Sequence, residues 1–256
     1  FLRTREGRVP PGVTAARRFF VEGAKEVGGI VEIGGADARK IEHVLRLKTG
    51  DEIVLIDSAA QTFAATIREI ARTVHAEITR DIEGAASAAA LQIDVAQAVP
   101  KGQRMEFVVE KGTELGVEAF VPFVCERSVR RAVGAERLSR WRRIARAAAQ
   151  QCGRKTIPPI LDPLDFEALL ARFEEYDAVL FAWELAAPAP LHERLREALP
   201  GRGRILVVVG PEGGFTHAEA ELAAGKDAAM LWLGPRVLRT DTAALVLLAV
   251  IGSLAS

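Results

Sequence analysis

The segment Val207–Gly225 has the pattern of a ligand-binding loop between a strand and a helix. Its apolar start runs into the letters GPEGGF, in which Pro211 restricts the backbone and Gly213 and Gly214 carry no side chains. The pattern predicts bare backbone directly after a strand. In open α/β sheets, ligands bind at this carboxyl edge. The segment is therefore the first candidate site. A tight turn with a purely structural role would give the same sequence pattern.

The loop lacks the common phosphate-binding patterns. The chain contains no GxxxxGK[ST] sequence, and no GxGxxG follows a predicted strand. Glu212 would repel a pyrophosphate, whereas its carboxylate suits a ligand with a cationic centre or ribose hydroxyls. Thr216, with Glu219 three residues later, predicts a capping box at the start of the next helix.

A second segment, Leu231–Gly252, repeats the arrangement with the letters LWLGPRVLRTDTAALVLLAVIG. An apolar run again ends in Gly-Pro, and two arginines precede Thr240–Thr242, a cluster of residues that cap helices. The helix that follows is apolar nearly all round. We expect it to be buried in the domain core or against a second copy of the chain.

Composition indicates a folded protein with an uneven charge distribution. Of the 256 residues, 49% are hydrophobic and 27% charged, which is typical of globular domains, and the formal net charge is zero. Residues 126–155 hold ten Arg or Lys against two acids, whereas residues 162–199 hold nine acids against three Arg. A neutral chain can therefore still present a basic face to nucleic acid.

Cysteine and histidine usage gives no sign of a metal site. Cys125 and Cys152 are isolated, which fits a reducing compartment, and the four histidines form no HxxxH pair. The most apolar stretch, Ala243–Ala255, is too short to cross a bilayer. We therefore expect a cytoplasmic protein that binds neither a metal nor a membrane.

Residues 1–17 are irregular in pattern, and residues 18–83 predict a small β-barrel. Several short runs with strand character surround one helical segment, as in small closed sheets. The strands are expected at Glu52–Asp57, Thr62–Ile70 and Val74–Ile78, and the helix at Ala36–Arg46. The small and featureless residues 84–90 are interpreted as a linker.

Residues 91–256 alternate strand and helix patterns. Such repeats predict a parallel sheet covered on both faces. The strands are expected at Leu91–Val99, Val117–Val124, Ala178–Trp183, Arg204–Gly210 and Ala228–Gly234, and two early helices at Gly102–Leu115 and Glu136–Gln151.

Five motifs in order carry a resemblance to a known family. They are RRFFVE, HVLRLKTGDEIVLID, KGQRMEFVVEKGTELGVEAFVPFVCERSV, AAAQQCGRKTIPPI, and GPEGGF followed by LGPRVLRTDTAAL. From Arg18 to the C-terminus the chain resembles the RsmE family of 16S rRNA (uracil-N3) methyltransferases, of the SPOUT superfamily. Two departures are small: Asp241 stands where the family more often has Glu, and Gly112 stands where a better helix former is common.

The resemblance implies a fold and a cofactor. The fold is a SPOUT-type parallel sheet with a C-terminal trefoil knot, preceded by a PUA-like β-barrel that binds RNA. The expected cofactor is S-adenosylmethionine, the methyl donor, and members of the family act as homodimers. The expected substrate is 16S rRNA or the small ribosomal subunit, methylated at N3 of a specific uridine. The implied cofactor-binding residues are Glu184, Gly210, Glu212, Gly213, Leu233, Gly234, Leu238 and Arg239.

The reaction asks mainly for alignment and charge stabilisation. Uracil N3 must lose a proton, and a nearby arginine could stabilise the anion. The candidates for this catalytic role are Arg239 and Arg154. The base stays open between Glu114, Asp241 and water; Glu114 could instead pair with Lys111, and Asp241 could simply cap its helix.

Contacts to RNA phosphates need basic side chains. Those expected to serve are Arg18, His43, Arg46, Arg127, Arg130, Arg131 and Arg154. Two alternatives remain open from the sequence. One is a SPOUT methyltransferase acting on tRNA or 23S rRNA, and the other is an RNA-binding protein without catalysis.

Overall fold

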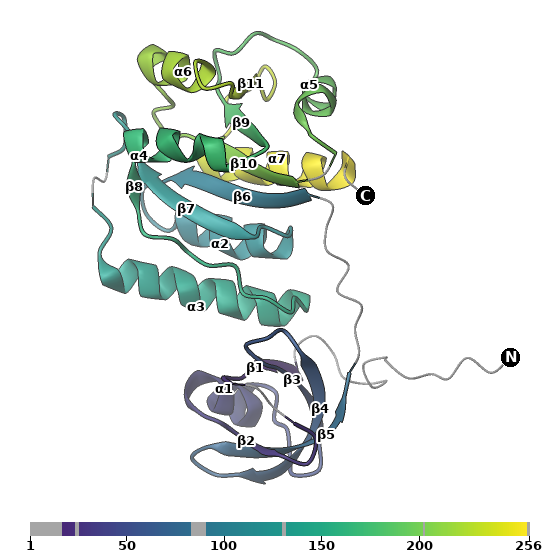
Figure 1. Cartoon of the computed structure of the whole chain (residues 1–256). Coiled ribbons are helices and arrows are strands. Elements are labelled where there is room, and N and C mark those ends of the chain that lie inside the picture. The colour runs from purple at the N-terminus through teal and green to yellow at the C-terminus, as the bar shows by residue number, and fades with distance from the viewer. Residues whose placement is uncertain (1–16, 24–25, 83–90, 130–131, 202, 255–256) are drawn as a thin grey trace, which may run out of the picture. The chain divides into compact units, whose positions relative to one another are not determined.

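The computed structural model describes residues 17–23, 26–82, 91–129, 132–201 and 203–254 (Figure 1). The chain divides into two compact units. Unit 1 comprises residues 1–87 and 149–157, and unit 2 comprises residues 88–148 and 158–256. The stretch expected to be a linker, 84–90, lies outside the described residues, as does nearly all of the irregular segment 1–17.

Unit 1 is built on a five-stranded sheet in the order β1-β3-β4-β5-β2. Strand β1 runs parallel to β3, and the other pairs are antiparallel. Phe19, Leu55 and Phe63 are almost completely buried in its core. The strands are β1 Arg18–Phe20, β2 Ile30–Ile33, β3 Glu52–Ile56, β4 Thr62–Ile70 and β5 Val74–Asp81. The three predicted strands are therefore present, and β5 continues three residues beyond its expected end.

The single helix predicted at residues 36–46 changes type in its middle. Helix α1 covers Gly35–Arg39 and continues as the π-helix η2, Lys40–Val44, after which Arg46 adopts a φ of 52°. The wider turn keeps Ile41 in the core and leaves Val44 72% exposed. Hydrophobic periodicity predicts an α-helix here because it does not distinguish a π-turn from an α-turn.

Residues 149–157, which begin in the last turn of α3 (Ala135–Cys152), belong to unit 1. Ala149 is completely buried and packs in one cluster with Phe20 and Val54. Arg18 adds a polar contact, since its Nη1 donates to the carbonyl of Gly153 at 2.6 Å. The end of a long helix is thus part of the core of the N-terminal unit.

Unit 2 contains a six-stranded sheet in the order β11-β9-β10-β6-β7-β8, and every neighbouring pair is parallel. This confirms the α/β class and the parallel sheet. The strands are β6 Leu91–Ala98, β7 Ala119–Val124, β8 Leu164–Asp165, β9 Ala178–Ala182, β10 Gly203–Val209 and β11 Ala229–Leu231. Besides α3, the helical segments are α2 Arg104–Glu114, α4 Phe166–Ala171, η3 Arg172–Glu175, α5 Leu191–Ala198, α6 His217–Ala224 and α7 Thr240–Leu254.

The sheet of unit 2 is covered on both faces, as Figure 1 shows for α2 on one side and α4 and α6 on the other. On the second side, Leu206 and Val208 of β10 pack in one cluster with Phe166 and Phe215. Helix α7 contacts α2 and β10. Strands β6, β9, β10 and β11 are neighbours and parallel, so the loops that follow them meet at one edge.

Candidate functional site

A cavity of about 330 Å³ lies at this carboxyl edge of unit 2. It is walled by the loops after β9, β10 and β11, the first residues of α7 and the first residue of α2. Seven of the eight expected cofactor residues line it, namely Glu184, Gly210, Glu212, Gly213, Leu233, Leu238 and Arg239. Gly234, the eighth, does not line the cavity, and its φ is +110°.

Glycines in the loop after β10 bring backbone close to neighbouring groups. A Cβ on Gly210 would lie 2.9 Å from the ring of Phe215, and one on Gly213 would lie 3.2 Å from Cβ of Arg127. Gly214 has a φ of +67°, and a Cβ there would collide with the carboxylate of Glu184. The expected bare loop is therefore also a close-packed one.

Arg127 anchors this loop from a neighbouring segment. Its Nη1 donates to the carbonyls of Gly213 at 3.0 Å and Phe215 at 3.2 Å. Arg127 is also a predicted RNA contact, and the loop backbone is what its side chain bonds among the described residues. The helix after the loop begins as predicted, with a complete capping box between Thr216 and Glu219.

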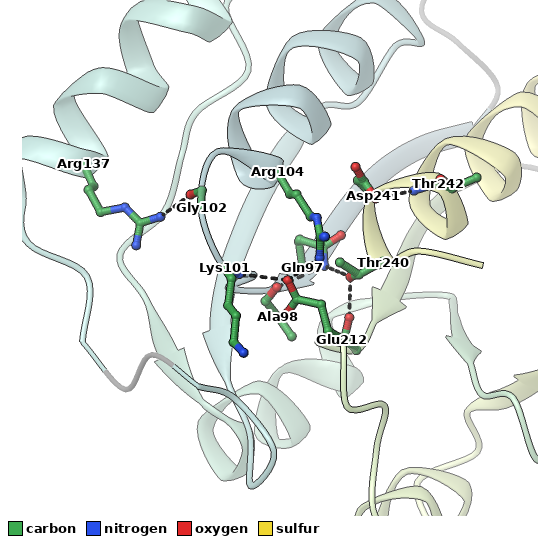
Figure 2. A network of polar contacts seen from close by, with 11 residues as sticks. Gln97, Ala98, Lys101, Gly102, Arg104, Arg137, Glu212, Thr240, Asp241 and Thr242 are labelled. Carbon is green, nitrogen blue, oxygen red and sulfur yellow. Dashed lines mark hydrogen bonds and ion pairs between the residues drawn. The ribbon is translucent and has the colours of Figure 1, made fainter. Parts of the chain in front are cut away.

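Glu212 ties the loop to the segment that precedes α2, as Figure 2 shows. Its Oε1 accepts hydrogen bonds from the backbone nitrogen of Lys101 at 3.0 Å and from Nη1 of Arg104 at 2.6 Å. The pair with Arg104 places opposite charges together at the rim of the cavity, because both residues line it. Arg137 supports the same segment by donating to the carbonyl of Gly102 at 3.0 Å.

The loop after β11 is arranged differently. Val237 is 89% exposed, and Arg236 and Arg239 are exposed at the cavity. Neither of these arginines forms a side-chain hydrogen bond or ion pair with the residues that the structure describes. Asp241 lies in the first turn of α7, and its Oδ1 accepts from the backbone nitrogen of Thr242 at 3.2 Å (Figure 2).

The other candidate base, Glu114, is placed as an ion-pair partner. Lys111 Nζ lies 2.8 Å from its Oε1 and also 2.8 Å from Glu110 Oε1. Both carboxylates, that of Glu110 first, raise the pKa of Lys111 above its ordinary value. Glu114 does not line the cavity.

Four of the expected RNA-binding residues lie in unit 1. The side chain of Arg18 is used on Gly153, while His43 is exposed and lies 3.5 Å from Glu42 Oε2. Arg46 is exposed in its left-handed conformation. Arg154 is also in unit 1 and is not among the residues that line the cavity of unit 2. The remaining two, Arg130 and Arg131, lie outside the described residues.

Several lining residues are absent from the expected set, among them the polar residues Arg104, Arg236 and Thr240. Arg236 and Thr240 flank the predicted Arg239, so their position in the same loop was a usable signal. Arg104 follows β6, whose carboxyl end shares the edge with β10, and only the strand order reveals this. In the described part of the chain, no group of three or more His, Cys, Asp or Glu is placed to hold a metal ion, and no helix is long and apolar enough to span a membrane.

The fold and the cavity agree with the comparisons to known proteins. Residues 87–252 match the family model of the RNA methyltransferase domain. The ribosomal RNA small subunit methyltransferase E of Bacillus subtilis is 30% identical over 92% of this chain and 95% of its own length.

Solved structures give the same result. The ribosomal RNA small subunit methyltransferase E of Neisseria gonorrhoeae, bound to S-adenosylmethionine, is 30% identical with a TM-score of 0.81, over 93% of this chain and 97% of that one. A Legionella pneumophila methyltransferase with the same bound cofactor is 29% identical with a TM-score of 0.84, over the same shares. The unit 2 fold is thus that of an RNA methyltransferase. The chain belongs to the family of ribosomal RNA small subunit methyltransferase E, the RsmE family.

Proposed function

We propose that this chain transfers the methyl group of S-adenosylmethionine to N3 of a specific uridine in 16S rRNA. The observation that carries the proposal is the cavity between the two Gly-Pro loops of unit 2, in a chain that belongs to the RsmE family. Its volume of about 330 Å³ falls within the range of roughly 300–1,000 Å³ that is usual for small-molecule sites.

The lining residues suit the proposed cofactor. Leu233, Leu238 and Val209 offer an apolar surface to the adenine, and backbone groups of the two loops can hydrogen-bond its edge. Glu184 is exposed at the cavity and can accept hydrogen bonds from ribose hydroxyls. The glycine backbone at Gly213 allows close approach. We propose Glu212 as a wall residue whose charge is balanced by Arg104.

The chemistry requires little beyond alignment. When bound, S-adenosylmethionine supplies a methyl group already activated by its sulfonium centre. Arg239 lines the cavity without a partner among the described residues, so its guanidinium is available to stabilise the uracil anion that forms at N3. We retain Arg154 of unit 1 as the second catalytic candidate. The base stays open between Asp241, Glu114 and water.

We propose that unit 1 is a PUA-like β-barrel that binds RNA, with the domains running 18–83 and 91–256 around a linker at 84–90. In support, its sheet has five short strands, and His43 and Arg46 are exposed on its surface. Arg127, Arg130, Arg131 and Arg154 would extend the phosphate contacts, together with Arg18. The substrate would be 16S rRNA or the small ribosomal subunit, in the cytoplasm.

The C-terminal segment supports a knot and a homodimer as further parts of the proposal. In support of the knot, strand β11 is at the sheet edge, next to β9, yet α7 returns to contact β10 and α2. Val237 is 89% exposed and Phe107 of α2 is 44% exposed. A second copy of the chain would bury these apolar side chains together with the partly exposed face of α7.

The proposal is tested in a strain that lacks this chain. A methyl group on N3 blocks the pairing edge of uracil, so reverse transcriptase stops there on native 16S rRNA. We expect the stop to disappear in the deletion strain and to return with the wild-type gene but not with Arg239→Ala. A complete set of native 16S rRNA modifications in the deletion strain would contradict the proposal, and loss of a methyl group from tRNA or 23S rRNA would favour the alternative substrate.

A further inference from the structure

A buried polar chain connects the ends of β6 and β10 with the start of α7 (Figure 2). Gln97 Nε2 donates to Thr240 Oγ1 at 2.8 Å, and the hydroxyl of Thr240 donates to the carbonyl of Gly210 at 2.5 Å. The same Nε2 also reaches the carbonyls of Ala98 at 3.0 Å and Val209 at 3.5 Å. Gln97 is fully buried and Thr240 is 5% exposed.

The direction of this chain follows from the chemistry of its groups. The amide nitrogen of Gln97 can only donate, the hydroxyl of Thr240 accepts one hydrogen bond and donates one, and the carbonyl of Gly210 can only accept. The hydrogen bonds therefore run in one direction, from Gln97 through Thr240 to Gly210. Removing the middle hydroxyl takes from the carbonyl of Gly210 its donor and from the amide of Gln97 its nearest acceptor at the same time.

Gln97 is not the residue that stability alone would favour at this place. Its Oε1 is buried without a hydrogen-bond partner among the described residues, and a buried polar atom of this kind is costly. A leucine would fill a similar volume without burying an oxygen that lacks a hydrogen-bond partner. We therefore attribute the role of the Gln97 amide to the groups that its hydrogen bonds hold in place.

What it holds are the two loops of the cavity. Gly210 begins the loop after β10, and Thr240 ends the loop after β11; both line the cavity, whereas Gln97 does not. We infer that Gln97 is a positioning residue that, through Thr240, sets the spacing of the two Gly-Pro loops and so preorganises the cofactor cavity. This inference rests on the proposed function, since it assigns Gln97 a role at the same site.

The test measures binding of S-adenosylmethionine and S-adenosylhomocysteine to the full chain by calorimetry. Thr240→Val and Gln97→Leu should each weaken both ligands about tenfold. Gln97 lies outside the cavity, so Gln97→Leu should keep kcat at saturating S-adenosylmethionine within about twofold. Thr240→Ser keeps the hydroxyl and should bind as the wild type does. Because the three groups act in series, the double variant with Gln97→Leu and Thr240→Val should lose no more affinity than the single variant that loses the most.

Controls separate positioning from general damage. Gln92→Leu changes an exposed glutamine at the other end of the same strand and should leave both affinities unchanged. If Gln97→Leu does not fold, the pair Thr240→Val and Thr240→Ser carries the test alone. Unchanged affinity in Thr240→Val, or equal loss in Thr240→Ser, would overturn the positioning role. Wild-type protein that binds neither ligand would instead overturn the proposed function.

Discussion

The two Gly-Pro loops that wall the cavity follow neighbouring parts of one sheet but are built in opposite ways. The loop after β10 is held at three points, by Arg127, by the pair of Glu212 and Arg104, and by the hydroxyl of Thr240. The loop after β11 exposes Val237 and carries Arg239 without a partner among the described residues. The first loop is thus braced by neighbouring side chains. The second leaves Arg239 without a partner among the described residues, which is what its proposed catalytic role requires.

The largest expected effect is the loss of turnover when the charge of Arg239 is removed. If Arg239 stabilises the uracil anion, Arg239→Ala should lower kcat by about 100-fold to 1,000-fold, as for loss of one oxyanion donor. Affinity for S-adenosylhomocysteine and the thermal midpoint should stay near the wild-type values. Single-turnover methylation of 16S rRNA measures this, with Arg194→Ala, an exposed arginine on α5 paired with Glu197, as the control. Unchanged turnover would remove Arg239 from the chemistry.

The next effect compares one glycine from each loop. Gly214→Ala combines a left-handed backbone with a collision against Glu184, whereas Gly234→Ala meets nothing within 4 Å and is strained only in its backbone. We expect Gly214→Ala to cost about 1–3 kcal/mol of unfolding free energy and more than Gly234→Ala. Denaturant unfolding of both variants measures the difference. Equal costs would mean that the first loop is not closely packed.

A smaller effect is expected at Arg127. Because its guanidinium holds the carbonyls of Gly213 and Phe215, Arg127→Ala should weaken S-adenosylmethionine binding by about tenfold or less, the size of one hydrogen bond. Arg143→Ala, an exposed arginine of α3, should weaken RNA binding without changing cofactor affinity. Calorimetry and an RNA filter-binding assay separate the two. An Arg127→Ala protein that loses only RNA affinity would favour the sequence-based expectation.

The smallest effect concerns Cys125, two residues before Arg127 in the segment that anchors the loop after β10. Burial raises the pKa of the Cys125 thiol, so it stays protonated in the folded protein at a pH where a free thiol ionises. Its contribution to stability is present below the unfolded pKa and is lost as pH rises through the folded one. Iodoacetamide at pH 8 should label the exposed Cys152 and spare Cys125. Labelling of both at equal rates would mean that this segment opens readily.

Local sequence patterns predicted much of this fold because their physical causes are local. The capping box of Thr216 and Glu219 depends on residues three apart, and β4 occupies the expected residues Thr62–Ile70. The eight expected cofactor residues came from the family resemblance, and seven of them line the cavity, in or beside the loops after β9, β10 and β11.

Long-range contacts could not be predicted in the same way. The bond from Arg104 to Glu212 joins residues 108 apart, and that from Gln97 to Thr240 joins residues 143 apart. No spacing rule connects such pairs, and only the assembled sheet brings them together. The anchoring role of Arg127 was missed for the same reason, since a basic residue in a basic stretch reads as a contact for phosphate.

The most direct measurement is a crystal structure of the full chain grown with S-adenosylmethionine. We predict the cofactor between the two Gly-Pro loops, with its adenine against Leu233 and Leu238 and the loop after β10 unmoved. A structure in which the same crystals leave this cavity empty, or hold the cofactor elsewhere in the chain, would contradict the site proposed for methyl transfer.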